Sequence, residues 1–195
     1  LSHLFGVARG RATLQSLASE QFRKSITMTS TPDEPTLDDQ YRKPVGAVGQ
    51  RIGQEMAQDH LPENQWTVTH LAPQPSDHIL EIGFGPGVAI ELILPHIPNG
   101  KIAGVDHSEL MVSEAQARNA AAVQQGRVEL RHGSADTLPF PDGTFDKVFG
   151  IHTVYFWSAP MQTLRDIHRV LKPNGTVLIT MLPKDRWQPN MAGAP

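Results

Sequence analysis

The sequence predicts an α/β protein with a doubly wound, mainly parallel sheet. Two observations predict it. Short apolar segments alternate with segments of helical periodicity from residue 78 onward, and three glycines, Gly83, Gly85 and Gly87, stand where the first apolar segment meets the first helical one. The chain has 195 residues, 39% hydrophobic and 19% charged, which suits about one globular domain.

Residues 1–44 are expected to lie outside that domain, as a disordered or extraneous extension. Residues 1–27 are basic and poor in acidic side chains, as a transit peptide is. An alternative is that Met28 begins the protein and the upstream piece is an unstructured extension or a translation artefact. Residues 29–44 are polar and punctuated by prolines, which favours a loose arm. The domain is therefore predicted to span residues 45–195.

Two helices are predicted before the alternation begins. Apolar residues recur at helical spacing from Val45 to Met56. Residues 61–64 read as a turn and residues 64–71 as a second, short helix that ends before Pro73.

The alternation then predicts five strands and the helices that connect most of them. The strands are residues 78–82, 101–106, 127–133, 146–152 and 176–182, and the helices are residues 88–95, 108–126 and 160–175. Strands that alternate with helices form crossover units, and these build a parallel sheet covered on both faces.

The glycine turn is the first candidate for a binding site. In doubly wound sheets, ligands bind beyond the carboxyl ends of the strands, where the strand order switches. Glycine lets the backbone adopt positive φ and removes the Cβ that would block a ligand. Asp106 ends the second strand, where a carboxylate can accept both hydroxyls of a ribose. Together they predict a cofactor of the adenosine type.

Three features favour a nucleoside other than NAD. The dinucleotide fingerprint G-x-G-x-x-G would need glycine at position 88, where the chain has Val88. Pro86 lacks the N–H that a pyrophosphate would use. Asp136, past the third strand, could bind the exocyclic amine of an adenine, although a turn-forming role is the alternative.

Four segments carry a resemblance to a known family. They are ILEIGFGPG, GVDHS, GSADTLPFPDGTFD and LKPNGTVLIT, in this order along the chain. In this order they resemble the motifs of class I S-adenosylmethionine-dependent methyltransferases, whose fold is Rossmann-like, and the branch that includes quinone-biosynthesis enzymes. The resemblance covers about residues 45–183.

The resemblance implies a cofactor, S-adenosyl-L-methionine, and a set of residues around it. Glu81 and the three glycines would line the methionine and ribose, Asp106 would take the ribose hydroxyls, and the adenine would lie among His107, Met111, Ala135 and Asp136. Ile151 and His152 would face the sulfonium and the acceptor. Glu81 also stands out by itself, because a carboxylate inside an apolar strand is costly to bury without a partner.

The reaction of this class needs alignment more than a reactive side chain. An aligned nucleophile can supply roughly 7–11 kcal/mol of the barrier. No metal is expected. His152 is the first candidate for a general base and Tyr155 the second, with a hydrogen-bonded pocket wall as the alternative for His152. Phe156, Trp157 and Trp66 could form an apolar acceptor pocket or could be packing aromatics.

Composition excludes several other classes of protein. The net charge of −3 gives no basic surface for nucleic acid. There is no cysteine, hence no disulfide, thiolate zinc site or cysteine nucleophile. No apolar run is long enough to cross a bilayer. A cytoplasmic protein acting on a small, partly apolar acceptor is expected.

The C-terminal part departs from the resemblance. Few residues follow the fifth strand, and they show no strand pattern, so we expect the usual C-terminal strand pair to be absent. An open edge at the fifth strand would favour pairing with another chain, for example in a homo-oligomer. Two rivals therefore stay open: a non-catalytic or degenerate cofactor-binding protein, and, less favoured, an NAD-linked oxidoreductase.

Overall fold

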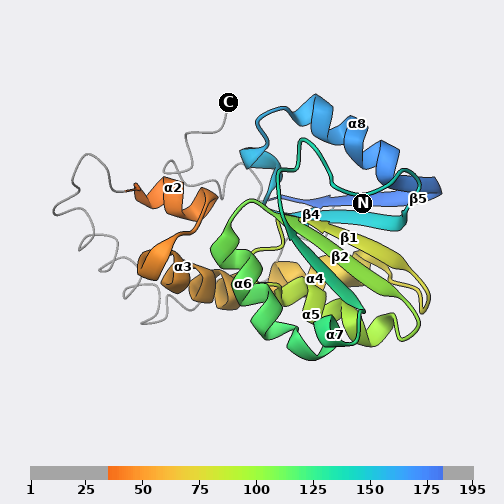
Figure 1. The fold of residues 1–195 in the computed structure, drawn as a ribbon, viewed down its shortest axis with the longest axis horizontal. Helices are drawn as coiled ribbons and strands as arrows, with labels where there is room; N and C mark the ends of the chain where they lie inside the picture. The colour runs from red at the N-terminus through yellow and green to blue at the C-terminus, as the bar shows by residue number, and fades with distance from the viewer. Residues whose placement is uncertain (1–34, 182–195) are drawn as a thin grey trace, which may run out of the picture. The chain divides into compact units, whose positions relative to one another are not determined.

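A parallel sheet of five strands organises the part of the chain that the structure describes. The computed structural model describes residues 35–181, and Figure 1 shows the sheet with its helices. The strand order is β3-β2-β1-β4-β5. The strands are β1 (His78–Ile82), β2 (Lys101–Asp106), β3 (Val128–His132), β4 (Phe145–Ile151) and β5 (Leu171–Thr180). The predicted doubly wound α/β fold is confirmed.

The strand order switches beside β1. This strand pairs in parallel with β2 on one side and with β4 on the other, so that Glu81 lies opposite both Gly104 and Phe149. Chain connections leave in opposite directions on the two sides of β1, which opens a crevice at the carboxyl ends of the strands.

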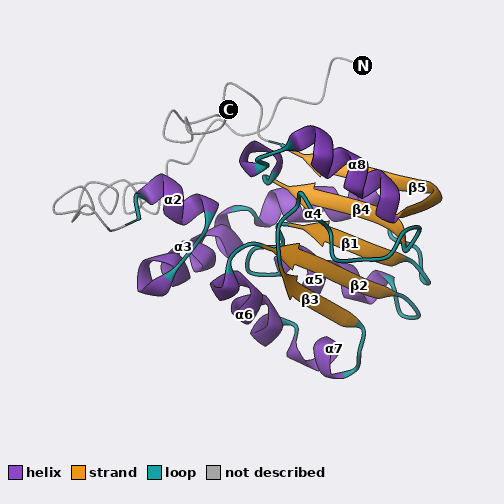
Figure 2. Cartoon of the chain, turned by 45° about the horizontal axis from the view of Figure 1, so that its top comes forward, coloured by secondary structure: helices purple, strands orange, loops and turns teal. Residues whose placement is uncertain are grey.

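Helices cover the sheet unequally. One face carries α4 (Leu61–Leu71), α5 (Val88–Ile93), α6 (Glu109–Arg118) and α7 (Ala120–Gln124), and the other carries α8 (Pro160–Val170), as Figures 1 and 2 show. Two further helices, α2 (Leu37–Arg42) and α3 (Gly46–Asp59), precede them, and the short 3-10 turns η1 (Leu94–His96) and η2 (Val154–Phe156) follow α5 and β4.

Each face of the sheet buries its own apolar cluster. The first is formed by side chains of α4, α5, α6 and α7 against one face, and includes Ile79, Ile90 and Phe149. The second packs Ile167 and Val170 of α8, with Phe140 of the loop between β3 and β4, onto the other face. The inner strands β1 and β2 are thus buried on both sides, which is why they read as nearly continuous apolar runs.

Three predicted elements differ from those observed. The expected turn at residues 61–64 is the first turn of α4, because Pro62 needs no N–H donor there. The helix predicted over residues 108–126 is divided at Asn119, whose Nδ2 donates to the carbonyls of Gly87 and Ala115. Residues 171–175, expected in the last helix, belong to β5, in which Asn174 adopts a positive φ of 67°.

The N-terminal boundary also differs from the prediction. Leu37–Arg42 form α2 and belong to the same compact unit as the sheet, so the arm predicted over residues 29–44 is wrong for this part. The oxygen Oε1 of Gln40, buried in α2, accepts a hydrogen bond from the N–H of Val45 and links α2 to α3. The predictions for residues 1–34 and for a missing C-terminal strand pair concern residues outside the described range.

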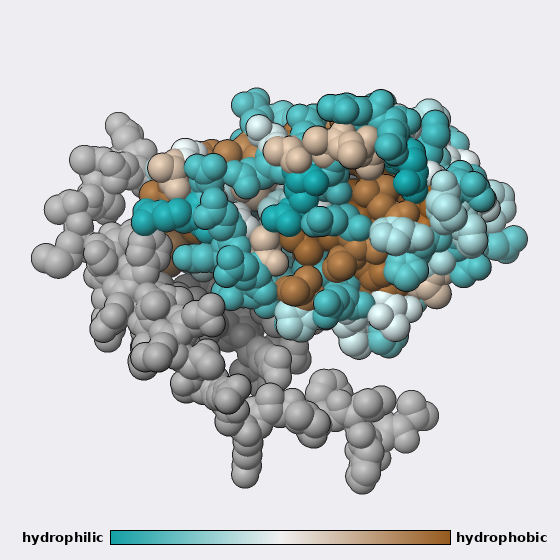
Figure 3. Space-filling model, turned by 90° about the horizontal axis from the view of Figure 1, so that it is seen from below, coloured by the Kyte–Doolittle hydropathy of each residue, from teal (hydrophilic) through white to brown (hydrophobic). Residues whose placement is uncertain are grey.

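Polar side chains dominate the surface drawn in Figure 3, with apolar side chains gathered over its central part.

Among the described residues, no helix has the length and apolar character that a bilayer span requires.

Candidate functional site

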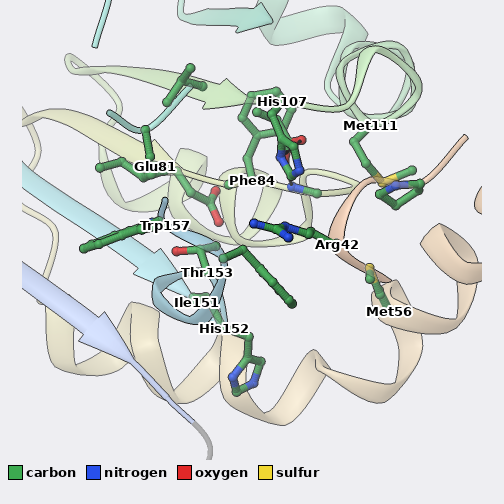
Figure 4. A pocket seen from close by; sticks show the side chains of 18 of the residues that line it. Arg42, Met56, Glu81, Phe84, His107, Met111, Ile151, His152, Thr153 and Trp157 are labelled. Carbon is green, nitrogen blue, oxygen red and sulfur yellow. Dashed lines mark hydrogen bonds and ion pairs between the residues drawn. The ribbon is translucent and has the colours of Figure 1, made fainter. Parts of the chain in front are cut away.

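A cavity of about 320 Å³ lies at the carboxyl ends of β1, β2 and β4. Figure 4 shows side chains from the sheet and from α2 and α3 pointing into it. Its volume is within the usual range of small-molecule sites. Ten of the twelve predicted site residues line it: Glu81, Gly83, Gly85, Asp106, His107, Met111, Ala135, Asp136, Ile151 and His152.

The three glycines of the turn all have positive φ, but they serve different purposes. At Gly85 an added Cβ would meet nothing within 4 Å, so this backbone faces open space. At Gly83 it would lie 2.4 Å from Cγ2 of Thr153. At Gly87 it would lie 2.8 Å from Cβ of Ala115 in α6, and Gly87 does not line the cavity. The prediction that all three face a ligand therefore fits Gly85 best, whereas Gly87 makes room for a helix.

Asp106 closes one side of the cavity and holds the glycine turn. Its Oδ2 accepts a hydrogen bond from the N–H of Gly85 at 2.9 Å, and its Oδ1 accepts one from Ser108 at 2.8 Å. Burial raises the pKa of Asp106, although these two N–H donors counteract the shift. Each carboxylate oxygen keeps a free lone pair, so the side chain can still accept ribose hydroxyls.

Glu81 is a buried carboxyl group at the centre of the cavity wall. Only 2% of the residue is exposed, and its Oε2 has no hydrogen-bond partner. Burial, with a smaller contribution from the negative charge of Asp106, raises the pKa of Glu81 well above its usual value. A positively charged ligand group would relieve this unfavourable environment.

His107 and Met111 extend the wall beyond Asp106. The Nδ1 of His107 lies 3.8 Å from Oδ1 of Asp106, and burial lowers the pKa of His107 despite that neighbouring carboxylate. Met111 is fully buried and packs its Cε over Gly53 of α3, which accounts for the glycine at that position.

Asp136 is committed to other side chains as well as lining the cavity. Its carboxylate accepts hydrogen bonds from the hydroxyls of Ser158 and, at 2.7 Å, Thr163. These bonds lower the pKa of Asp136, so the group is ionised near neutral pH. Asp136 thus links the loop after β3 to the start of α8. It has a structural role in this loop and also lines the cavity.

His152 lies on the opposite side of the cavity from His107 in Figure 4. It adopts a positive φ of 57° directly after β4, and its N–H donates to the carbonyl of Thr180. Neither nitrogen of its buried imidazole has a partner. Burial, together with His60, lowers its pKa to about 4. Tyr155, the second candidate base, does not line the cavity.

Several lining residues were not identified from the sequence. Tyr41 and Arg42 come from α2, Met56 from α3, and His60 from the junction of α3 and α4, all of which precede the motifs. No pattern in the sequence marks them. Phe156 and Trp157 line the cavity, and Trp157 also packs into the second apolar cluster, so both interpretations of these aromatics stay open.

Trp66 does not belong to this wall. It is 51% exposed on α4 and stacks on His70, with ring centroids 3.8 Å apart.

Unpartnered buried polar atoms gather around this cavity. Of the eight such side-chain atoms in residues 35–181, five belong to its lining: Oε2 of Glu81, both ring nitrogens of His152, Oγ1 of Thr153 and Nε1 of Trp157. Buried polar groups in native proteins are nearly always hydrogen-bonded. Their concentration here indicates a site that a polar ligand completes.

Comparison with known proteins identifies the family. A family model described as a methyltransferase domain matches residues 80–179. The uncharacterized methyltransferase YdaC of Bacillus subtilis is 35% identical over 133 residues, which are 68% of this chain and 71% of YdaC. A demethylmenaquinone methyltransferase of Symbiobacterium thermophilum is 40% identical over 108 residues, 55% of this chain and 42% of that protein.

A solved structure agrees in fold. A methyltransferase of Aquifex aeolicus, described as SAM-dependent, superimposes with a TM-score of 0.56 at 23% identity, covering 64% of this chain and 67% of that one. The chain spans about half the length of the demethylmenaquinone methyltransferases that it matches, from 42% to 57%.

Proposed function

This chain belongs to the class I S-adenosylmethionine-dependent methyltransferases, and on that premise we propose that its cavity binds S-adenosyl-L-methionine and directs the methyl group to a small, partly apolar acceptor. The observation that carries the proposal is the cluster of unpartnered polar atoms around an open glycine turn.

The residues present fit the cofactor. Its methionine part carries an ammonium group and a carboxylate. Glu81 offers an unpartnered carboxylate oxygen to the ammonium, and Arg42 points into the same cavity in Figure 4 with a positive charge for the carboxylate. Asp106 accepts the ribose hydroxyls, and the adenine lies among His107, Met111, Ala135 and Asp136.

The cofactor supplies a methyl group already activated by a positive sulfur, so these residues bind, orient and exclude water. Gly85 allows the ligand to approach the backbone, and Ile151 lies beside the switch point of the sheet. Alignment of the acceptor with the methyl group is the chief contribution of such a site. His152 is neutral near pH 7 and can take a proton from an acceptor that must lose one.

The acceptor class is supported by the lining and by the relatives. Phe156, Trp157 and Met56 give the cavity apolar walls. Several relatives are demethylmenaquinone methyltransferases, which favours a ring compound of the quinone type. The open edge of β5, which pairs only with β4 among the described residues, supports association with a second copy of the chain as a further proposal.

Calorimetric titration tests the cofactor first. The protein should bind S-adenosylmethionine and S-adenosylhomocysteine and should not bind NAD. Binding of NAD alone would contradict the proposal and favour an oxidoreductase.

A search for transfer of labelled methyl to quinols, phenols and amines then separates an enzyme from a cofactor-binding protein. Binding of both sulfur nucleosides without any transfer would favour the non-catalytic alternative.

A further inference from the structure

Two histidine side chains meet at one end of the cavity. His60 lies where α3 ends and α4 begins, and His152 follows β4. Their ring centroids are 4.9 Å apart with an interplanar angle of 67°, and both residues line the cavity. The sequence separates them by ninety-two positions, so only the fold brings them together.

The pair is uncharged near neutral pH. Burial lowers the pKa of His60, although the negative charges of Asp59 and Glu63 counteract the shift. Burial and the neighbouring His60 lower that of His152. Neutral imidazole carries one N–H donor and one acceptor nitrogen. Both nitrogens of His152 are buried without a partner, so this residue lacks two hydrogen bonds that a ligand could make.

The surroundings of the pair favour one acceptor chemistry. The carboxylates of the lining are Glu81, Asp106 and Asp136, and the latter two already accept hydrogen bonds from protein groups. Asp59 and Glu63, whose negative charges act on His60, do not line the cavity. Phe156 and Trp157 contribute aromatic walls, against which flat rings pack well.

A metal ion is a weaker explanation. Within residues 35–181 no group of three or more potential metal-binding side chains occurs, and two imidazoles alone do not make up a usual coordination shell.

We propose that His152 and His60 bind the hydroxyl group of a flat, hydroxylated ring acceptor, a phenol, naphthol or enol, with His152 as the proton acceptor and His60 as its positioning residue. This inference rests on the proposed function. The His60 ring lies edge-on to His152 and restricts its rotation, while the hydrogen bond from the His152 N–H to the Thr180 carbonyl fixes its backbone.

The transfer is balanced in atoms and electrons. The acceptor O–H bond breaks, and its proton passes to an imidazole nitrogen of His152. The acceptor oxygen, or a ring carbon conjugated with it, forms the new bond to the methyl carbon. The electron pair of the broken carbon–sulfur bond stays on sulfur, which becomes a neutral thioether. Where carbon is the nucleophile, that carbon then loses its own proton to solvent and the oxygen regains one.

A pair of matched probes tests this inference. We would measure the affinities of 2-naphthol and 2-methoxynaphthalene for the protein saturated with S-adenosylhomocysteine, because the ether carries a methyl group in place of the hydroxyl hydrogen and cannot donate a hydrogen bond. Wild-type protein should bind naphthol at least tenfold more tightly between pH 6 and 8, since the ether leaves the imidazole acceptor unpaired.

Substitutions then test which residues cause the preference for naphthol over its ether. His152→Gly, which tolerates positive φ and has no side-chain acceptor, should remove it. His60→Phe, which keeps an aromatic ring but no nitrogen, should reduce it without changing the affinity for S-adenosylhomocysteine. His168→Asn, on the exposed side of α8, is the matched control and should change neither.

A second readout separates positioning from general damage. In the His60→Phe variant, the pKa of His152, followed by the NMR shift of its ring proton, should rise because the positive form of His60 no longer opposes it. Equal binding of naphthol and its ether by wild-type protein, or a preference that survives His152→Gly, would overturn the inference alone. Failure of S-adenosylhomocysteine to bind would overturn the proposed function and this inference with it.

Discussion

Substitution of Gly85 by alanine separates the cost of backbone conformation from the loss of a ligand contact. Gly85 has φ of 51°, and its missing Cβ faces open space in the cavity. In this left-handed conformation alanine is less favourable than glycine by about 1–2 kcal/mol. Part of this is regained because alanine restricts the unfolded chain.

The expected loss of stability is therefore about 1 kcal/mol, or roughly 2–4 °C in the melting temperature for a chain of this size. The hydrogen bond from the N–H of residue 85 to Asp106 is retained, since alanine keeps that donor. The affinity for S-adenosylmethionine should fall at least tenfold, which corresponds to about 1.4 kcal/mol, because the new methyl group occupies space that the ligand needs.

Gly126→Ala is the matched control. Gly126 has φ of 68°, and nothing lies within 4 Å of the position its Cβ would take, but it ends α7 away from the cavity lining. Both variants should melt at similar temperatures in differential scanning calorimetry, and only Gly85→Ala should bind the cofactor weakly in calorimetric titration. Wild-type affinity in a folded Gly85→Ala protein would refute the location of the ligand.

Three further substitutions test other parts of the site. Glu81→Gln should lower cofactor affinity and make protein stability less dependent on pH. Because the pKa of Glu81 is raised in the folded protein, the stability of the wild type falls as pH rises above about 4.5. The variant should therefore be the more stable protein at pH 8, as measured by denaturant unfolding. His152→Asn should make the free energy of unfolding less sensitive to acid. With a pKa of about 4 for His152, the wild-type folded state gains stability as pH rises from about 4 to 6.5. If the variant loses stability below pH 6.5 as steeply as the wild type does, the imidazole is not buried as described. Arg169→Ala should lower the free energy of unfolding by about 2–3 kcal/mol, since its guanidinium donates to Asp166 and to the carbonyls of Leu138 and Phe140. Hydrogen exchange should show faster opening of residues 133–142 in this variant. The control Arg165→Ala, on the exposed face of α8, should change neither the stability nor the exchange.

The sheet and the turn after β1 were predictable because their signals are local. A strand buried on both faces must be apolar, and a turn with positive φ favours glycine. A few neighbouring residues are therefore enough to identify β1 and the turn after it. Asp106 was predictable for the same reason, since a carboxylate at the end of an apolar strand is itself unusual.

The boundaries of elements were less predictable because they depend on distant partners. The helix over residues 108–126 is divided at Asn119, whose amide reaches back to Gly87, thirty-two positions earlier in the chain. The folded unit begins at Leu37 rather than at Val45 because Gln40 bonds to the start of α3 and the Ser108 hydroxyl donates to the carbonyl of Pro44.

The amino-acid sequence determined the order of strands and helices, the glycine turn and the acidic residue that closes the second strand, because periodicity and local backbone preference act over neighbouring residues. Only the tertiary structure decided which glycine faces empty space, that Glu81 has no partner, and that His60 lies against His152. The reason is physical: burial, charge and van der Waals contact depend on distance in space, and the packing of α3 against α4 and α6, with α4 on one face of the sheet, sets those distances.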